Sequence, residues 1–209
     1  VNEMKIVLSA MDIDVWEVID AAATKPFGFQ AFYPGPGLGG HCIPIDPYYL
    51  TWKAREVNLT TRFIELAGEV NRSMPEYVVQ QTVLALNRAR KSVADARILV
   101  LGLAYKPNVD DIRESPSFEI IEKLQVLEAK VDYHDPHVPA THKMRHHDLQ
   151  MKSVVEFSAQ ALETYDCVII ATHHDAYDWQ MIADHARLIV DTRGALRKVT
   201  GPRDHIVGA

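Results

Sequence analysis

The 209-residue sequence is poor in cysteine, in long apolar runs and in positive charge. Its two cysteines, Cys42 and Cys167, are too few and too far apart for a disulfide framework, so we expect a reducing, cytoplasmic compartment. No apolar run approaches the length of a membrane span. The net charge of -6 and the pI near 5.9 argue against nucleic acid or a membrane as partners. An anionic ligand must therefore be met by a few local Lys and Arg side chains.

The first eleven residues already have helical spacing, with Met4, Val7, Leu8 and Met11 on one face. Neither an initiator Met nor a convincing N-cap precedes them. We therefore expect that the chain starts inside a helix and is a fragment of a longer protein.

The pattern along the chain changes at about residues 91–96. Before this point we expect helices at 15–23, with Asp12 or Asp14 as the cap, and at 48–57, 61–71 and 75–90. Beyond it, short buried strands at 97–101, 130–134, 167–171 and 188–191 alternate with helices. This predicts an α/β fold, with a helical domain at 1–92 and a Rossmann-like parallel-sheet domain at 93–209. The tryptophans at 16, 52 and 179 are expected in the core.

The stretch Tyr33–Tyr49, YPGPGLGGHCIPIDPYY, contains four glycines and four prolines around one cysteine. Such a segment is expected to be a rigid, shaped loop, because glycine permits close backbone approach and proline fixes φ. His41, Cys42 and Asp46 on this loop are typical of a positioned nucleophile with a polar neighbour. The alternative is a tight loop whose cysteine is merely buried.

Cations follow the predicted strands at the edge where open parallel sheets bind ligands. Lys106 and Arg113 come after the first strand and Arg193 after the last. They predict an anion site, most plausibly for phosphate, to which the helix after Ser115 would contribute its N-terminal dipole. The alternative is a solvated charge cluster in which Lys106 and Arg113 pair with the acidic residues at 110, 111 and 114.

The G-x-G-x-x-G fingerprint of dinucleotide binding is absent after the first strand, where only Gly102 stands. The loop glycines follow no strand, so their similar spacing is rejected as a match. Asp135 could bind a ribose hydroxyl or simply open an Asp-Pro turn. The histidines at 134–147, 173 and 174 lie in polar connections, and we expect no metal site.

Two motifs, GPGLGGHCIPIDPYYL and GLAYKPNVDDIRESP, resemble the UDP-glucose/GDP-mannose dehydrogenase family of NAD-dependent nucleotide-sugar 6-dehydrogenases. The first resembles the catalytic-cysteine motif and the second the opening of the UDP-binding domain. The HCIPIDP form is most similar to the UDP-N-acetylglucosamine branch, followed by the UDP-N-acetylmannosamine branch. Because UDP-glucose enzymes typically have a GGSC-like motif, His41 in place of Ser favours an N-acetylhexosamine.

The resemblance implies a role for each matching residue. Cys42 would capture the C6 aldehyde as a thiohemiacetal and later form a thioester, and Asp46 would assist proton transfer and hydrolysis. A carboxylate beside the thiol would need a cation nearby to offset it. Arg113 would contact the cofactor, NAD. The UDP-sugar would be bound by Lys106, Arg193, Tyr33, Phe32, Gly39, Gly40 and His41, with a weaker case for Lys25 reaching a neighbouring subunit.

The resemblance also implies what this sequence lacks. The family's N-terminal Rossmann domain with G-x-G-x-x-G, and its catalytic lysine and asparagine, match nothing in these residues. We therefore expect that the chain alone is inactive. We also expect a homodimer through the apolar faces of 1–11 and 61–90, and a product that feeds polysaccharide biosynthesis. The alternative is a non-catalytic module that binds UDP-sugar or serves assembly.

Overall fold

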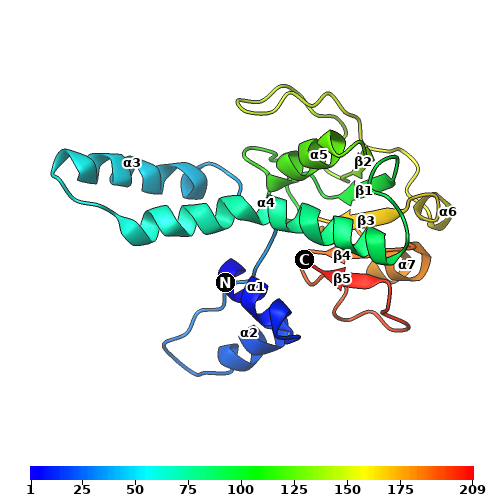
Figure 1. The fold of residues 1–209 in the computed structure, drawn as a ribbon, viewed down its shortest axis with the longest axis horizontal. Coiled ribbons are helices and arrows are strands. Elements are labelled where there is room, and N and C mark those ends of the chain that lie inside the picture. Colours follow the sequence, from blue (N-terminus) through cyan, green and yellow to red (C-terminus); the bar gives the residue numbers. More distant parts are fainter.

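The computed structural model describes residues 1–209 and contains a five-stranded sheet in the order β2-β1-β3-β4-β5 (Figure 1). The strands are β1 (Arg97–Leu101), β2 (Lys130–His134), β3 (Cys167–Ile170), β4 (Ile189–Asp191) and β5 (Ile206–Gly208). Every neighbouring pair is parallel. The α/β fold is therefore confirmed, and β5 is a strand that the sequence pattern did not predict.

Two apolar layers enclose the sheet, because side chains along β1 alternate between its faces. Ile98 and Val100 pack with α4 (Arg62–Arg88) and α5 (Pro116–Val126). Leu99 and Leu101 pack with α6 (Ala159–Leu162) and α7 (Trp179–His185). None of the helices combines the length and the apolar character that a membrane span requires.

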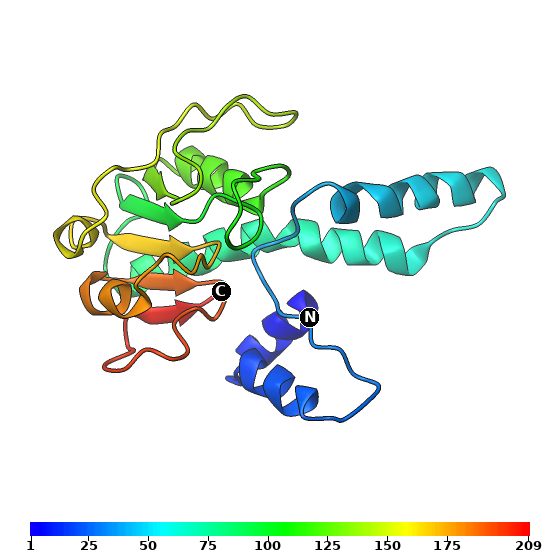
Figure 2. The same cartoon turned by 180° about the vertical axis from the view of Figure 1, so that it is seen from behind.

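The helical part of the chain extends away from the sheet (Figures 1 and 2). The helix α3 (Cys42–Glu56) and the first half of α4 form an arm, while α1 (Asn2–Ala10) and α2 (Val15–Ala23) form a separate pair. The second half of α4 belongs to the core beside the sheet, where Val78 and Leu86 are buried. One helix therefore joins the arm to the sheet, and the division at residues 92 and 93 stays a prediction.

Two helix boundaries differ from the prediction. The expected helices at 61–71 and 75–90 are one helix, α4, with Pro75 inside it. Pro75 removes one helical hydrogen bond, but buried Met74 and Val78 on either side keep this turn packed. The helix α3 starts at Cys42 rather than at 48, so the second half of the predicted loop is helical despite Pro47. Asp14, one of the two expected caps, does cap α2.

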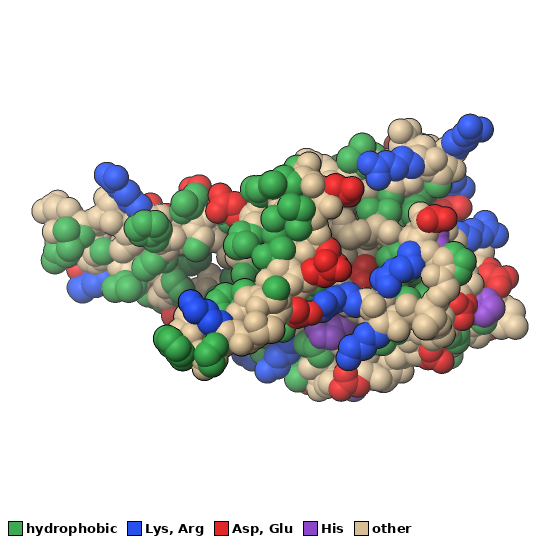
Figure 3. Space-filling model, turned by 90° about the horizontal axis from the view of Figure 1, so that it is seen from below, with side chains coloured by type: hydrophobic (Ala, Val, Ile, Leu, Met, Phe, Trp, Pro, Cys, Tyr) green, Lys and Arg blue, Asp and Glu red, His purple; other side chains and the backbone are tan.

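Burial on α1 is inverted, and much of α3 is exposed. On α1, Asn2 and Lys5 are buried, whereas Met4 and Val7 of the expected apolar face are about half exposed. Trp52 on α3 is 63% exposed, so its predicted place in the core is wrong, while the other two tryptophans are half-buried. Figure 3 shows hydrophobic side chains gathered on the surface of the arm and of the α1–α2 pair. These helices bury too little apolar surface to account for their own sequence.

Candidate functional site

The glycine-rich loop at residues 33–40 lies against the carboxyl ends of the strands. A Cβ on Gly35 would lie 2.3 Å from Nη1 of Arg193, which follows β4. A Cβ on Gly39 would lie 2.5 Å from Cβ of Tyr105, which follows β1. Glycine is therefore required at these positions for close approach between the loop and the sheet.

Backbone hydrogen bonds fix the loop at both ends. The N–H of Gly35 donates to Oδ1 of Asn2 at 3.0 Å, and the N–H of Gly40 donates to the carbonyl of Arg113 at 2.8 Å. Gly40 has φ +87°, a value that favours glycine. A Cβ on Gly39 would also lie 3.2 Å from Cα of Ser115, the N-cap of α5. The loop therefore lies over the helix N-terminus that we expected to face the phosphate.

The loop delivers the candidate nucleophile at the first turn of α3. Cys42 is a free, exposed cysteine at the first helical position, where the helix dipole favours negative charge. Asp46 follows four residues later and therefore lies on the same face of the helix. Its carboxylate is exposed and makes no hydrogen bond or ion pair within the chain. Burial of the cysteine, the alternative, applies only to Cys167, whose pKa is raised by burial.

The two cations after β1 have different surroundings. Arg113 is paired with Asp111 at 2.6 Å, as the charge-cluster alternative predicted. The Asp111 carboxylate raises the pKa of Arg113, and weaker electrostatic contributions come from Tyr105 and Cys42. The side-chain donors of Arg113 that form hydrogen bonds all go to Asp111. Lys106 makes no ion pair, is exposed, and has its Nζ 5.4 Å from the centre of the Tyr105 ring.

The Arg193 side chain, just after β4, forms a single hydrogen bond within the chain, to a neutral backbone carbonyl. Its Nε donates to the carbonyl of Ala171 at 2.8 Å, and its terminal nitrogens make no hydrogen bond within the chain. Burial lowers the pKa of Arg193 to about 10, partly offset by the neighbouring Asp191 carboxylate. Both oxygens of Asp191 accept backbone N–H groups, from Arg193 and from Leu196. A guanidinium with unused donors remains beside the loop.

The remaining predicted residues are exposed, and they differ in the contacts that they make. Tyr33 stacks on Trp16 of α2 with ring centroids 5.7 Å apart and is still exposed, as is Phe32. His41 is the exposed N-cap residue of α3 and makes no capping hydrogen bond. Lys25 is exposed and has no polar contact with the residues above. The loop thus brings Gly35 against Arg193, and Gly40 against Tyr105 and the backbone of Arg113.

Asp135 is a structural carboxylate and is not available to a ribose. Its oxygens accept backbone N–H groups of residues 103, 104, 137 and 138 and lie 3.1 Å from Nε2 of His174. Burial raises the pKa of Asp135, but these hydrogen bonds outweigh it and lower the pKa to about 2. The turn-opening alternative is therefore correct. His, Cys, Asp and Glu side chains form no group of three or more that could hold a metal ion.

Sequence reasoning missed two residues at the site, Asn2 and Lys5. Asn2 binds the loop through Gly35 and donates from Nδ2 to Oδ1 of Asn71 at 2.8 Å. Lys5 donates from Nζ to the carbonyl of Thr192 at 3.3 Å. The sequence does place both residues on one face of the expected helix, opposite Met4 and Val7. A polar helical face is usually exposed to solvent, so this pattern offered no reason to expect them at a site.

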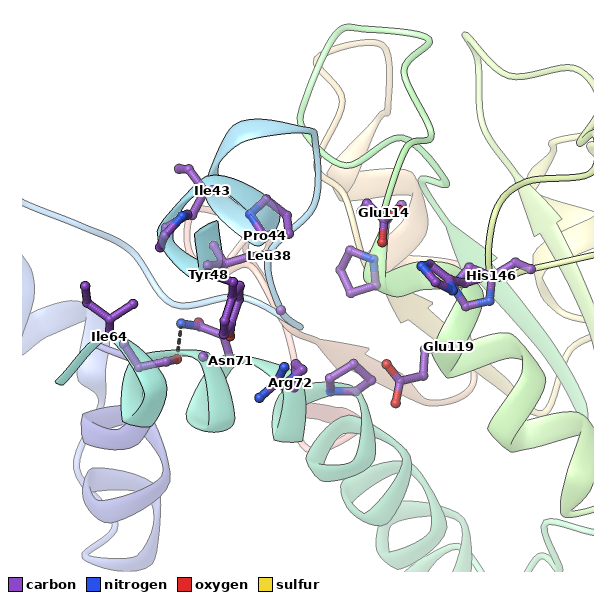
Figure 4. A pocket seen from close by; sticks show the side chains of 18 of the residues that line it. Leu38, Ile43, Pro44, Tyr48, Ile64, Asn71, Arg72, Glu114, Glu119 and His146 are labelled. Atoms are coloured by element: carbon purple, nitrogen blue, oxygen red, sulfur yellow. Dashed lines mark hydrogen bonds between the residues drawn. The ribbon is translucent and has the colours of Figure 1, made fainter. Parts of the chain in front are cut away.

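A pocket of about 740 Å³ lies on the other side of the loop, between α3, α4 and α5. Figure 4 shows Leu38, Ile43, Tyr48 and Asn71 on one side of it and Glu119 on the other. It contains none of the predicted catalytic residues and neither Lys106 nor Arg193. The cations at the strand ends, not this pocket, therefore define the candidate site.

The loop thus packs against Tyr105 and Arg193 after two strands of a parallel sheet and leads to an exposed cysteine at the first turn of α3. Comparison with known families then identifies the class of protein. The central domain of the UDP-glucose/GDP-mannose dehydrogenase family matches residues 1–73, and the UDP-binding domain of the same family matches residues 99–198. The chain belongs to this family.

Individual relatives agree with this assignment. A UDP-N-acetyl-D-glucosamine 6-dehydrogenase from Pseudomonas aeruginosa is 36% identical over 177 residues, which cover 85% of this chain and 40% of that protein. A UDP-N-acetyl-D-mannosamine dehydrogenase from Pyrococcus horikoshii is 32% identical over 202 residues, 94% of this chain and 44% of that protein. A solved UDP-D-ManNAc dehydrogenase structure from the same organism superimposes with TM-score 0.80 at 28% identity, covering 99% of this chain and 46% of that one. The chain thus spans less than half the length of these relatives.

Proposed function

We propose that this chain supplies the cysteine and the UDP-sugar site for NAD-dependent oxidation of a UDP-N-acetylhexosamine at C6. One observation supports this most strongly. The loop that presents Cys42 and Asp46 also packs against Arg193 and Tyr105, at the strand ends where Lys106 stands. The nucleophile and the anion-binding cations therefore belong to one connected unit.

The chemistry follows from the residues present. The Cys42 thiolate adds to the C6 aldehyde carbon, a C–S bond forms, and the carbonyl oxygen takes up a proton to give a thiohemiacetal. Water later attacks the thioester carbon, the C–S bond breaks, and the uronate and the thiolate are released. Asp46 accepts the proton of that water. Two two-electron oxidations belong to this sequence, from the C6 alcohol to the aldehyde and from the thiohemiacetal to the thioester. NAD, when bound, would supply the hydride acceptor for both.

The sheet does not form a cradle for NAD. A Cβ on Gly102, the only glycine directly after β1, would lie 2.5 Å from Cβ of Thr172, so this glycine serves packing between strand ends. Arg113 is the one residue that we assign to NAD, through donors that Asp111 leaves free. We therefore derive no step through the cofactor from this chain, and we propose that the 209 residues alone do not reduce NAD.

The sugar is proposed to be N-acetylglucosamine, on the strength of the HCIPIDP motif. Calorimetric titration of the chain with UDP-N-acetylglucosamine, UDP-N-acetylmannosamine and UDP tests both parts of the proposal. Lys106→Ala should weaken binding of all three at least about tenfold, because a charge-assisted hydrogen bond is lost. Lys130→Ala is the matched control, since Lys130 lies at the amino-terminal end of β2, away from the site, and pairs with Asp95. No binding by the folded wild-type chain would overturn the proposed site.

The missing dinucleotide cradle favours a second candidate, a non-catalytic UDP-sugar-binding or assembly module. The two functions differ in what Cys42 does. If Cys42 is the nucleophile, the 6-aldehyde of UDP-N-acetylglucosamine should protect it from iodoacetamide, and Asp46→Asn should retain this protection. Unchanged alkylation of Cys42 by iodoacetamide in the presence of bound aldehyde would favour the binding module.

We further propose that the chain forms a homodimer and resides in the cytoplasm. Exposed apolar side chains on α1 and on α4, among them Met4, Val7 and Phe63, support a self-association surface. Light scattering that shows only monomer at micromolar concentration would contradict the dimer.

A further inference from the structure

The buried ammonium of Lys5 is not explained by its contacts within the chain. Lys5 is 3% exposed and forms no ion pair, and its one hydrogen bond goes to the Thr192 carbonyl. An ammonium carries three N–H donors, so two of them are unused. Burying a charge with a single neutral acceptor is unfavourable unless another group compensates it.

Two further polar groups with unused capacity lie at the same strand ends. The terminal nitrogens of Arg193, next in sequence to Thr192, make no hydrogen bond within the chain. Nδ1 of His173, just beyond β3, is buried and has no hydrogen-bond partner. The nearby Asp191 carboxylate forms no hydrogen bond with any of them, because its oxygens are directed at the backbone N–H groups of residues 193 and 196. A ligand with several anionic oxygens would satisfy all three groups.

We propose that Lys5 is a further substrate-binding residue, which together with Arg193 holds the diphosphate of the UDP-sugar. This inference rests on the proposed function, because it adds a third cation to the site of Lys106 and Arg193. It also gives α1 a role: the helix contacts both the loop, where Asn2 holds Gly35, and the end of β4, where Lys5 donates to the Thr192 carbonyl.

The position of Lys5 makes binding sensitive to pH. Burial lowers the pKa of Lys5 to about 7, the Asp191 carboxylate raises it, and the Arg193 guanidinium lowers it again. His173 shares the strand end, and its pKa is lowered below the ordinary value by burial and by Arg193, so it stays neutral above pH 7. A bound diphosphate favours charged Lys5, so affinity should be highest at low pH and fall as pH rises through 7.

The test is calorimetric titration of the chain with UDP-N-acetylglucosamine from about pH 6 to about pH 8.5. Over this range the charge of its diphosphate does not change, because both phosphates are already ionised. For the wild type we expect an affinity about tenfold lower at the upper end, with proton uptake on binding. Lys5→Met should bind about tenfold more weakly at pH 6 and show no pH dependence between the two ends. Lys5→Arg, which stays charged throughout, should bind tightly at both.

The possible failures can be told apart. Wild-type affinity and pH profile in Lys5→Met, with binding still lost in Lys106→Ala, would overturn the role of Lys5 and leave the proposed function standing. Absence of binding by the folded wild type would overturn both. Thermal unfolding of Lys5→Met provides the check on structure. A merely structural lysine predicts a lower melting temperature with unchanged affinity, whereas a ligand-binding lysine predicts lost affinity with an unchanged or higher melting temperature.

Discussion

The sheet and the helical part follow opposite rules of burial. In the sheet domain, Phe118 on α5 and Ile169 on β3 are fully buried, and the buried Asp135 carboxylate after β2 is paired with His174. In the helical part, α1 buries Lys5 and exposes Val7. The comparison teaches that the sheet's sequence is explained by its own packing. On α1, by contrast, the exposed Val7 and the buried Lys5 are not explained by packing within the chain.

The largest expected effect is in the sheet core. Phe118→Ala should lower the free energy of unfolding by about 3–5 kcal/mol, because it opens a cavity in a fully buried cluster. Phe63→Ala is the matched control, since Phe63 on the arm is 89% exposed and should change it by less than about 0.5 kcal/mol. Urea unfolding of both variants measures the difference. Similar losses in the two would remove the contrast between the regions.

The next effect concerns the buried carboxylate behind the site. Asp135→Asn should cost about 1.5–3 kcal/mol, because donors that face an anion would then face an amide. The pKa of Asp135 is lowered to about 2 in the folded state, so its stabilising contribution is complete above about pH 4 and is lost as pH falls toward 2. Acid denaturation followed by circular dichroism should show this pH dependence in the wild type. If Asp135→Asn lost stability with falling pH in the same way as the wild type, Asp135 would not be the group responsible.

Loop packing should give a smaller effect that reaches the site. Gly39→Ala should cost about 1–3 kcal/mol, because its Cβ would lie 2.5 Å from Tyr105 and 2.8 Å from the Glu114 carbonyl. Binding of UDP-N-acetylglucosamine should weaken with it. Gly208→Ala is the control, since nothing lies within 4 Å of the added Cβ. Equal melting temperatures for the two variants would show that the loop is not held against the sheet.

The smallest effect on stability is expected on α1. Val7→Ser should leave the unfolding free energy of the dilute chain within about 0.5 kcal/mol, because Val7 is already exposed. It should nevertheless weaken the proposed dimer, which sedimentation at rising concentration measures. A large loss of stability in the dilute chain would mean that the apolar face of α1 is covered within the monomer. The contrast between α1 and the sheet core would then be removed.

The sequence was sufficient to predict the regions in which pattern and packing agree. The buried runs RILVL and CVIIA predicted β1 and β3, since each is covered by the chain's own helices. The strand-end rule placed Lys106 and Arg193 at one edge, and the motif around Cys42 predicted a positioned, exposed thiol.

The parts that could not be predicted depend on contacts distant in sequence. Pro75 reads as a helix start, and only burial among core residues shows that α4 continues through it. Trp52 reads as core, because composition does not reveal that the arm lacks a second layer to cover it. Lys5 reads as a solvated side chain, and its role depends on the Thr192 carbonyl, 187 residues away.

The proline within α4 has a mechanical consequence. Pro75 has no N–H, so the helical hydrogen bond that the Asn71 carbonyl would receive is missing at the turn from 71 to 75 of a 27-residue helix. The turn lies between the half of α4 packed beside α3 and the half in the sheet core. The start of α3 lies close to this turn, since Ile43 and Pro44 line the same pocket as Asn71 and Pro75. The N–H of the neighbouring Gly40 donates to the Arg113 carbonyl. A bend at the turn would therefore move the far end of the arm most, while Cys42 would stay near the strand ends.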